Sequence, residues 1–434
     1  MPQIAWPSLP GTGVARFDDR LRAVTANGSP PPIRATVAAT WALFVGIMMI
    51  TAGNGLQFTT IGVRSTLEDF SALAIGIVTA GYYAGFLLGA RFTFRALGRV
   101  GHLRVFGGLA SSASASVLLH SLWIHPVSWS LMRFVTGFCM AGVFIVAESW
   151  INDRATNDTR GMLMATYMVI GIGGRAAGQG LLNLGDPEGF DLFVMSSVLV
   201  SMALVPMMMS ASSAPPIVQH EPISFREMRE VVPTGLITIF VAGLTTATLG
   251  GLTAVYGTKV GMGTGELSLF ISALMVGAVV LQIPIGHLSD RFRRRIVMLV
   301  VAGGAAGIAT TLALVASTGW VPLVLIALLG GLTYPLYGLG VAYTNDWIPS
   351  EKRAGASMIL MIVNGVGAII GPLVAALAMS TTAAGLFWTI VVVQVVFAGY
   401  LFVRIVIRAP VPVDRQTRFT PLSERATAMI LRRK

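Results

Sequence analysis

Two arginines lie inside apolar stretches that are long enough to cross a membrane. Arg133 lies in the stretch 128–149, and Arg175 lies in the stretch 162–184. A guanidinium group binds carboxylate and phosphate oxygens through paired hydrogen bonds. Burying an arginine in a bilayer costs at least ~2.5 kcal/mol on insertion scales, so each of these side chains requires a partner or a water-filled cavity.

The depth of the two arginines connects them. Arg133 stands 15 residues before Glu148, and Arg175 stands 15 residues after Arg160. Glu148 and Arg160 lie at the same end of two consecutive antiparallel helices. At 1.5 Å per residue, both arginines should therefore lie at the same level, roughly 22 Å from that end.

The acidic residues are missing from that level. None of the 19 falls in the interior of an apolar stretch, because Glu148, Asp290 and Asp346 lie at helix ends. We therefore expect an anionic or carboxylate-bearing solute to bind beside the two arginines. The alternative is that the arginines bond to backbone carbonyls and to polar neighbours such as Asn183 or Gln179.

The other candidates for the lining of a central cavity are uncharged polar side chains inside apolar stretches. They are Asn54, Gln57, Gln179, Thr245, Tyr256, Gln282, Tyr334, Tyr337 and Asn364. Each one alone is as well explained by a hydrogen bond between helices. As a set, they predict a polar cavity.

Several other chemistries find no support in the sequence. There is no His and Cys cluster with metal-ligand spacing, no phosphate-binding Gly-x-x-x-x-Gly-Lys loop and no arrangement that would activate a nucleophile. We therefore expect no metal, no cofactor and no enzymatic activity. The single cysteine, Cys139, excludes a disulfide within the chain.

The composition is that of a membrane protein. Of the 434 residues, 54% are hydrophobic and 11% are charged, whereas a soluble globular protein carries about 25% charged residues. The net charge of +11 could suggest nucleic acid as a partner. The basic residues fall in short groups between apolar stretches and form no patch on a soluble domain, so we expect lipid and not nucleic acid around this chain.

Twelve apolar stretches each reach the ~20 residues that a spanning helix requires. They cover approximately residues 36–61, 72–92, 104–124, 128–149, 162–184, 191–210, 232–256, 267–287, 296–317, 321–344, 356–379 and 384–405. We therefore expect an all-α membrane protein with twelve transmembrane helices in two six-helix bundles. The predicted divisions are a tail at 1–34, a bundle at 35–210, a polar linker at 211–231, a bundle at 232–405 and a weakly ordered tail at 406–434.

The distribution of basic residues predicts the orientation. If both termini are cytoplasmic, 26 of the 30 Lys and Arg lie inside, Arg64 and Lys259 lie outside, and Arg133 and Arg175 lie within the membrane. Cytoplasmic loops carry an excess of Lys and Arg. We therefore expect a multi-pass membrane protein with both termini in the cytoplasm.

An internal repeat supports the division into halves. An offset of 193 residues aligns Arg160, Met168, Gly174 and Gly178 with Arg353, Met361, Gly367 and Gly371. Two repeated bundles are typical of transporters that bind their substrate between the halves near the middle of the bilayer. The repeat therefore predicts a central site between the bundles.

The clearest motif separates two of the apolar stretches. It reads Gly286-His287-Leu288-Ser289-Asp290-Arg291-Phe292-Arg293-Arg294-Arg295. The order Gly-x-Leu-Ser-Asp-Arg-x-x-Arg-Arg resembles the cytoplasmic signature loop of the major facilitator superfamily, a large family of twelve-helix secondary transporters. The resemblance implies transport by alternating access, with Gly286, Asp290, Arg291 and Arg294 at a cytoplasmic gate.

The corresponding loop of the first half, residues 89–104, departs from the family pattern. Thr93 stands where the family has an aspartate. We expect Glu148, which closes the fourth stretch, to pair there with Arg91, Arg95 or Arg104. The ending Glu148-Ser149-Trp150, together with Val-Gly-His-Leu-Arg at 100–104, resembles a poorly characterised bacterial subgroup of the superfamily. This resemblance implies a place in the cytoplasmic membrane of a bacterium.

Two further matches concern the arginines. Arg133 begins an Arg-x-x-x-Gly pattern that ends at Gly137 and resembles the fourth-helix motif that is often tied to proton coupling in the family. Arg175 lies in a glycine-rich helix where antiporters of the family often also carry a proline, which this helix lacks. The motif therefore gives little support to antiport.

These observations predict a monomeric secondary or facilitative transporter of a small organic solute. An organic anion is the first candidate, and the involvement of protons stays open. One alternative is a proton-coupled efflux pump for lipophilic compounds. The other is a membrane sensor or scaffold that does not transport.

Overall fold

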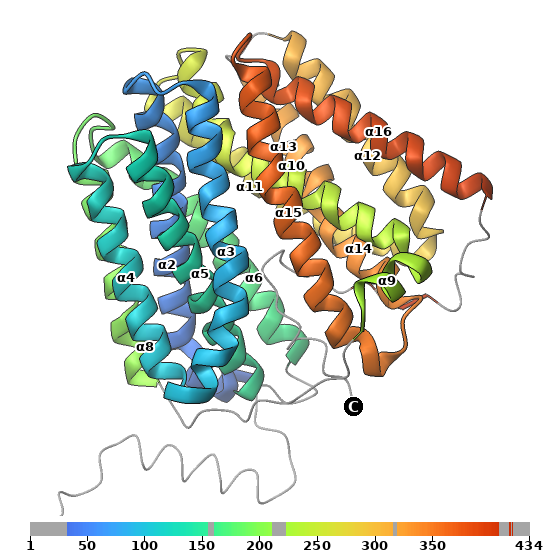
Figure 1. Cartoon of the computed structure of the whole chain (residues 1–434), viewed down its shortest axis with the longest axis horizontal. Helices are drawn as coiled ribbons and strands as arrows, with labels where there is room; N and C mark the ends of the chain where they lie inside the picture. Colours follow the sequence, from blue (N-terminus) through green and yellow to red (C-terminus); the bar gives the residue numbers. More distant parts are fainter. Residues whose placement is uncertain are drawn as a thin grey trace, which may run out of the picture.

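The computed structural model describes residues 33–154, 160–210, 223–315, 319–407, 416, 417 and 419. Within these residues every regular element is a helix (Figure 1). The expected N-terminal tail lies outside the described residues up to residue 32, and so do residues 211–222 of the expected linker. Of the expected C-terminal tail, only residues 406, 407, 416, 417 and 419 are described.

The first half consists of seven α-helices and one short 3-10 helix in the described part of the chain. In order, they are α2 (Ile33–Leu67), α3 (Ala72–Val100), α4 (His102–Leu122), α5 (Pro126–Arg154), α6 (Arg160–Leu181), η1 (Leu182–Leu184), α7 (Asp191–Met202) and α8 (Leu204–Ser210). Helix α5 continues beyond the predicted end at 149, so Glu148 lies inside this helix and not at its end as we expected.

The second half begins with a short helix from the expected linker. The elements are α9 (Phe225–Val231), α10 (Pro233–Lys259), α11 (Thr264–Arg291), α12 (Arg294–Leu314), α13 (Trp320–Thr333), α14 (Pro335–Asn345), η2 (Ser350–Lys352), α15 (Arg353–Met379) and α16 (Gly385–Ile407). We call the end of the molecule that carries loops 91–104 and 286–295 the basic end, which lies at the bottom of the first half in Figure 1. Arg64 and Lys259 lie at the opposite end.

Ten spans in the described part of the chain are long and apolar enough to cross a membrane. The sequence predicted twelve. Helix α6 and the pair α7 and α8 occupy the fifth and sixth predicted positions but do not meet the same criteria. Arg175 and Gln179 make α6 more polar than its neighbours, and the sixth segment is divided at Ala203.

Prolines account for two breaks inside predicted segments. A proline has no backbone N–H and cannot bond to the carbonyl four residues earlier. Pro206 therefore leaves the carbonyl of Met202 without its helical partner, and α7 ends at Met202. Pro335 likewise begins α14, where the tenth predicted segment divides into α13 and α14.

Apolar side chains cover the outer faces of the helices. On α16, Val396, Phe402 and Val406 are exposed by 68%, 61% and 72%. A protein dissolved in water rarely exposes so large an apolar surface. The molecule is therefore a multi-pass membrane protein whose outer side chains contact lipid.

The repeated glycines hold equivalent helix pairs together. In the first half, a Cβ on Gly178 would meet the backbone of α2 at Ala52, so α6 packs closely on α2. In the second half, a Cβ on Gly371 would meet the backbone of α10 at Leu244, so α15 packs on α10 in the same way. Small residues let helices approach closely in a membrane, where apolar surface gives little drive for association.

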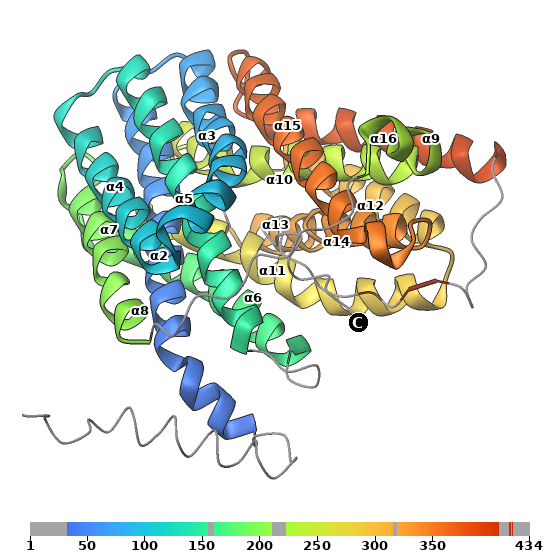
Figure 2. The same cartoon turned by 60° about the horizontal axis from the view of Figure 1, so that its bottom comes forward.

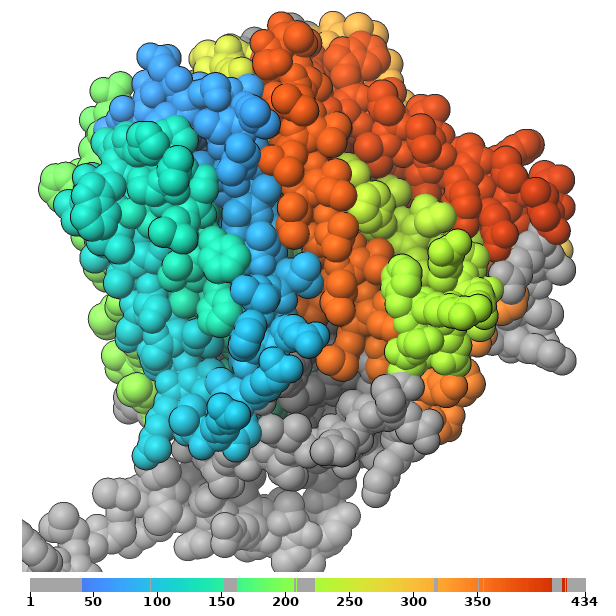
Figure 3. All heavy atoms as spheres, in the orientation of Figure 1, coloured from blue at the N-terminus to red at the C-terminus, as the bar shows by residue number. Residues whose placement is uncertain are grey.

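The two halves meet mainly through α3 with α15, α2 with α10 and α6 with α11. Near the end opposite the basic end, a Cβ on Gly76 would lie 2.6 Å from Ala376, and Ser268 Oγ donates to the carbonyl of Gln179 at 2.7 Å. Figures 1 and 2 show α3 and α15 together at this end and diverging toward the basic end. In the space-filling view the two helices share a seam (Figure 3).

Backbone contact between α3 and α5 depends on glycines from both helices. A Cβ on Gly85 would collide with the carbonyl of Phe134, and a Cβ on Gly137 would collide with the carbonyl of Tyr82. Gly137 is the glycine of the Arg-x-x-x-Gly pattern. The pattern therefore has a packing role in this structure.

We predict that Gly137→Ala destabilises the protein. The added methyl would push α5 away from α3, and overpacking of this kind costs roughly 1–3 kcal/mol. Thermal unfolding of the purified protein in detergent should show a clearly lower transition temperature.

The matched control is Gly108→Ala on α4, where a Cβ would meet no atom within 4 Å. Alanine has a higher helix propensity than glycine, so this variant should be at least as stable as the parent. Equal stability of Gly137→Ala and Gly108→Ala would show that α3 and α5 do not depend on backbone contact.

Candidate functional site

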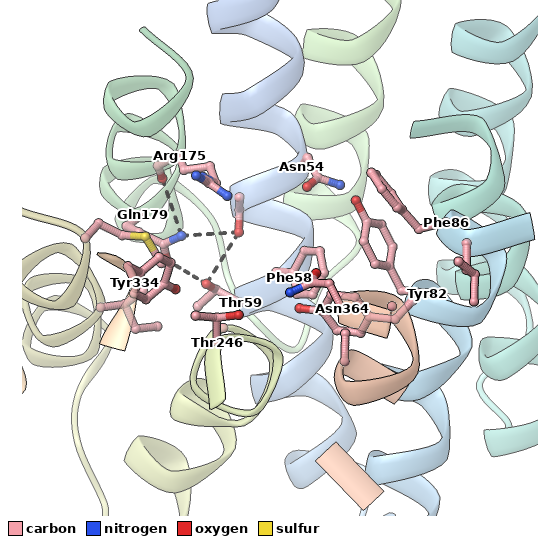
Figure 4. Close-up of a pocket in the computed structure, with 18 of the residues that line it drawn as sticks. Asn54, Phe58, Thr59, Tyr82, Phe86, Arg175, Gln179, Thr246, Tyr334 and Asn364 are labelled. Carbon is pink, nitrogen blue, oxygen red and sulfur yellow. Dashed lines mark hydrogen bonds between the residues drawn. The ribbon is translucent and has the colours of Figure 1, made fainter. Parts of the chain in front are cut away.

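A cavity lies between the two halves and is lined by residues of both (Figure 4). The first half contributes side chains from α2, α3 and α6, and the second half contributes side chains from α10, α11 and α15 and from Tyr334 between α13 and α14. The cavity therefore lies where the internal repeat predicted a central site.

Five of the eleven residues that the sequence suggested for the cavity line this space. They are Asn54, Arg175, Gln179, Tyr334 and Asn364. Figure 4 shows Arg175, Gln179 and Tyr334 on one side of α2, and Tyr82 and Phe86 on the other. The structure thus gathers these five polar side chains from α2, α6 and α15 and from Tyr334 at one place.

The three amides in the cavity differ in their hydrogen bonds. Gln179 is fully engaged, because Oε1 accepts from Thr59 Oγ1 at 2.5 Å and Nε2 donates to the carbonyl of Gly55 at 3.3 Å. Asn364 Nδ2 donates to the carbonyl of Ile239 at 3.3 Å. Asn54 is 1% exposed, and neither its Oδ1 nor its Nδ2 has a hydrogen-bond partner among the described residues.

Arg133 lies behind the cavity wall and does not line the cavity. Its guanidinium carbon lies 4.0 Å from the ring centre of Phe58 and 4.5 Å from that of Tyr82. A desolvated cation over an aromatic face gains about 2 kcal/mol or more. The two rings therefore stabilise this buried charge, which is the partner that its depth required.

The two arginines contact α2 about one turn apart. Arg133 lies over Phe58, whereas the backbone of Arg175 packs against Gly55. Three residues of helix correspond to about 4.5 Å along the axis. The arginines thus lie at similar depth, but only Arg175 faces the cavity.

The remaining five candidates lie elsewhere. Thr245 accepts a hydrogen bond from Gln394 Nε2 at 3.2 Å, and the ring of Tyr256 packs edge-to-face on that of Phe387. Gln57 is 1% exposed and lies outside the cavity lining, and neither polar atom of its amide has a partner among the described residues. Tyr337 is buried in the core of the second half beside Ile285. Gln282 is half-buried on α11.

Aromatic residues form much of the wall, and the sequence analysis did not select them. Phe58, Tyr82, Tyr83 and Phe86 line the cavity. The rings of Phe58 and Tyr82 lie 4.7 Å apart in an edge-to-face arrangement, and those of Tyr82 and Tyr83 lie 5.4 Å apart. The adjacent tyrosines in the middle of an apolar stretch were the available signal, because a buried tyrosine hydroxyl usually requires a polar partner.

The cavity is electrostatically one-sided. Among the described residues that line it, Arg175 is the only charged side chain, and none is Asp, Glu or His. A guanidinium group in the wall of a cavity favours a solute with negative or strongly hydrogen-bond-accepting groups. The rings and amides provide stacking surfaces and hydrogen-bonding groups around it.

The predicted gate residues of the second half form a compact network at the basic end. Arg294 is 1% exposed and pairs with Asp346 at 3.1 Å and with Asp290 at 3.5 Å. Burial raises the pKa of the Asp346 carboxyl, and the charge of Arg294 opposes this rise. Arg291 is exposed, and Gly286 lies against the ring of Phe419.

The gate residues of the first half are arranged differently. Glu148 is fully buried and accepts a hydrogen bond from the hydroxyl of Tyr167 at 3.1 Å. Arg91, Arg95 and Arg104 are exposed. Glu148 is thus inside the bundle, whereas the three arginines that we expected to pair with it lie on the surface.

No group of three or more His, Cys, Asp or Glu that could hold a metal ion occurs within the described ranges. Cys139 is a buried free thiol.

Comparison with known proteins identifies relatives over most of the chain. The family model described as Major Facilitator Superfamily matches residues 235–434. The uncharacterized MFS-type transporter YcaD of Escherichia fergusonii is 24% identical over 339 residues, which cover 78% of this chain and 88% of the relative. YcaD of an Escherichia coli strain has the same identity and coverage.

Solved transporter structures share the fold. A mutant of the nucleoside transporter NupG superposes with a TM-score of 0.72 at 14% identity and covers 85% of this chain and 100% of its own. A bacterial homologue of the human lysosomal transporter Spinster, in an inward-facing and unoccupied conformation, gives 0.66 at 16% identity, with coverage of 86% and 97%. The family model thus matches the second half of the chain, and the relatives that cover most of the chain are named as MFS-type transporters. Together with the shared helical fold, these matches support a membrane transporter similar to members of the major facilitator superfamily.

Proposed function

We propose that this protein moves a small organic solute across the bacterial cytoplasmic membrane by alternating access. The cavity between the halves would be the binding site, and rocking of one half against the other would expose it to each side in turn. The cavity is lined by both halves, and this observation supports transport over a sensor or scaffold, because relative movement of the halves would rebuild the site.

We place the basic end in the cytoplasm, following the distribution of Lys and Arg. The contacts of Gly76 with Ala376 and of Ser268 with Gln179 then lie on the outer side. Helices α3 and α15 diverge toward the cytoplasm (Figure 2). The structure would accordingly represent a state that opens inward.

The chemical class of the solute is inferred from Arg175. It is the one charged side chain among the described residues of the lining, and aromatic rings and amides surround the same space. A solute with a flat ring and an acidic group would stack on the rings and bind the guanidinium. We therefore propose an organic anion with a planar ring as the substrate class.

A nucleoside-like solute is the second candidate. Amide side chains bind the edges of nucleobases through paired hydrogen bonds, and aromatic rings stack on their faces. Asn54 and Asn364 line the cavity beside Tyr82 and Phe86. The nucleoside transporter NupG shares the fold at 14% identity, which alone carries no argument about substrate.

Proton-driven efflux of lipophilic compounds has less support. A proton carrier in the binding site would be a side chain that titrates, such as Asp, Glu or His. The described lining residues include none of these. We therefore favour facilitated diffusion or anion exchange by a monomer over coupling to protons.

We predict that Arg175→Ala removes the binding of organic anions and leaves the fold intact. A hydrogen bond to a charged group contributes about 1.5–3 kcal/mol, which corresponds to roughly 10–100-fold in affinity. Ligands that bind the folded state raise its apparent stability. Thermal unfolding with a panel of anions, cations and neutral solutes should show stabilisation by anions in the parent and none in the variant.

The control variant is Arg175→Lys, which keeps the positive charge and should retain part of the anion response. Stabilisation of parent and Arg175→Ala alike by lipophilic cations would contradict the proposed anion site. Equal stabilisation of both proteins by nucleosides would favour the second candidate.

We predict opposite effects on stability from two substitutions of cavity amides by leucine. Asn54→Leu should make the ligand-free protein more stable, because a buried amide without partners is costly, and should weaken solute binding by about tenfold. Gln179→Leu should make it less stable, because Thr59 and Gly55 lose their partner. Thermal unfolding with and without a bound solute measures both effects.

This pair separates a ligand-binding amide from a structural one. A loss of stability in Asn54→Leu as large as that in Gln179→Leu would show that Asn54 has a structural partner. Unchanged solute affinity in Asn54→Leu would remove it from the binding site.

A further inference from the structure

The last described residues of the chain pack onto the basic end of the second half. Phe419, within the expected C-terminal tail, is partly buried against the core cluster that contains Ile285 and Tyr337. Thr417 and Gln416 are partly buried as well. These three residues therefore lie against the folded second half, as the residues of a bound peptide would.

A slot between α11 and α14 holds the ring of Phe419. Gly286 on α11 forms one side, where a Cβ would collide with the ring. Gly338 on α14 forms another, where a Cβ would lie 2.9 and 3.0 Å from ring carbons. Apart from the backbone of α14 itself, only Phe419 among the described residues has atoms within 4 Å of a Cβ on Gly338. The slot exists because both positions are glycine.

Two carboxylates and one arginine engage the backbone of the same segment. The N–H of Phe419 donates to Asp290 at 2.7 Å. The N–H and hydroxyl of Thr417 both donate to Asp346 at 2.8 Å. The carbonyl of Thr417 accepts from Arg294.

The site contacts both the polar backbone groups of the segment and the apolar ring of Phe419. Asp290, Arg294 and Asp346 also pair with one another, so the segment completes a network that is already fixed in position. Charge-assisted hydrogen bonds of this kind are about twice as strong as neutral ones. Asp290 and Arg294 of the signature loop, together with Asp346, are therefore held by their ion pairs in the positions from which they contact Thr417 and Phe419.

We propose that the basic end of the second half is a binding site for Thr417 and Phe419 of the same chain, which it recognises as a short peptide of the form Thr-x-Phe. The bound segment restrains the junction of α11 and α12, because it occupies Asp290 and fills the slot beside Gly286. This second statement rests on the proposed function: the segment must leave before the basic end closes in the transport cycle.

The site is tested by the trypsin sensitivity of the bond between Arg418 and Phe419 in the full-length purified protein. The N–H of this bond is held by Asp290, so cleavage requires release of the segment, and its rate follows the released population. Gly338→Leu places a side chain in the slot and leaves the tail sequence unchanged. We expect cleavage at this bond, quantified by mass spectrometry, to accelerate about tenfold.

The matched control is Gly307→Leu on α12, where a Cβ would meet no atom within 4 Å. This variant should be cleaved at the parental rate. Equal cleavage of parent, Gly338→Leu and Gly307→Leu would overturn the binding site. Acceleration in both variants alike would also overturn it, because the effect would then come from general destabilisation.

The restraint on closure is measured separately by electron-spin distances. Spin labels at Arg99→Cys and Arg293→Cys report the distance between the halves at the basic end, in a Cys139→Ser background; both arginines are exposed. Adding Gly338→Leu should raise the fraction of molecules with a short distance. If the tail is released and the fraction of molecules with a short distance does not rise, the proposed restraint is wrong but the binding site stands. If the distance distribution has a single population with every solute tested, alternating access itself is contradicted.

Discussion

The burial of one positive charge among aromatic rings determines how the first half is built. Arg133 on α5 lies over Phe58 of α2 and Tyr82 of α3. An uncompensated charge at this depth costs at least ~2.5 kcal/mol, and stacking on two desolvated rings offsets much of that. The same two rings line the central cavity. The requirement to compensate Arg133 therefore also fixes part of the wall against which a solute would bind.

Glycines make this arrangement geometrically attainable. Gly137 lies one turn after Arg133 and brings the backbone of α5 against Tyr82. With a larger side chain there, the guanidinium would stand farther from the ring over which it lies. Lipid gives little drive for helix association, so close backbone approach provides the contact energy instead. The packing and the charge compensation of this corner therefore depend on the same pair of helices.

The sequence predicted the helices well and the cavity only in part. Hydrocarbon requires continuous apolar segments, so the approximate positions of the helices show in the chain. The count of twelve spans and the end expected at residue 149 did not hold, because α6 and the divided pair α7 and α8 do not meet the criteria for a span and α5 runs on to Arg154. Depth along a helix follows from counting residues, which is why Arg133 and Arg175 were placed at one level. Rotation about the helix axis depends on neighbours distant in sequence, such as Phe58 beside Arg133. The sequence therefore could not tell which arginine faces the cavity.

The two halves repeat in fold but differ in chemistry at the basic end. Thr93 is buried and donates its hydroxyl proton to the carbonyl of Gly89 in its own helix at 2.7 Å. At the corresponding place Asp290 accepts from the backbone of Phe419 and pairs with Arg294. The Thr93 hydroxyl has a single donor, which is already bonded within its own helix, so it cannot donate to another element as well. A carboxylate accepts hydrogen bonds through two oxygens and can replace one donor by another. Because the first half has Thr93 where the second half has Asp290, contacts at the basic end can be exchanged on the second half and not at Thr93.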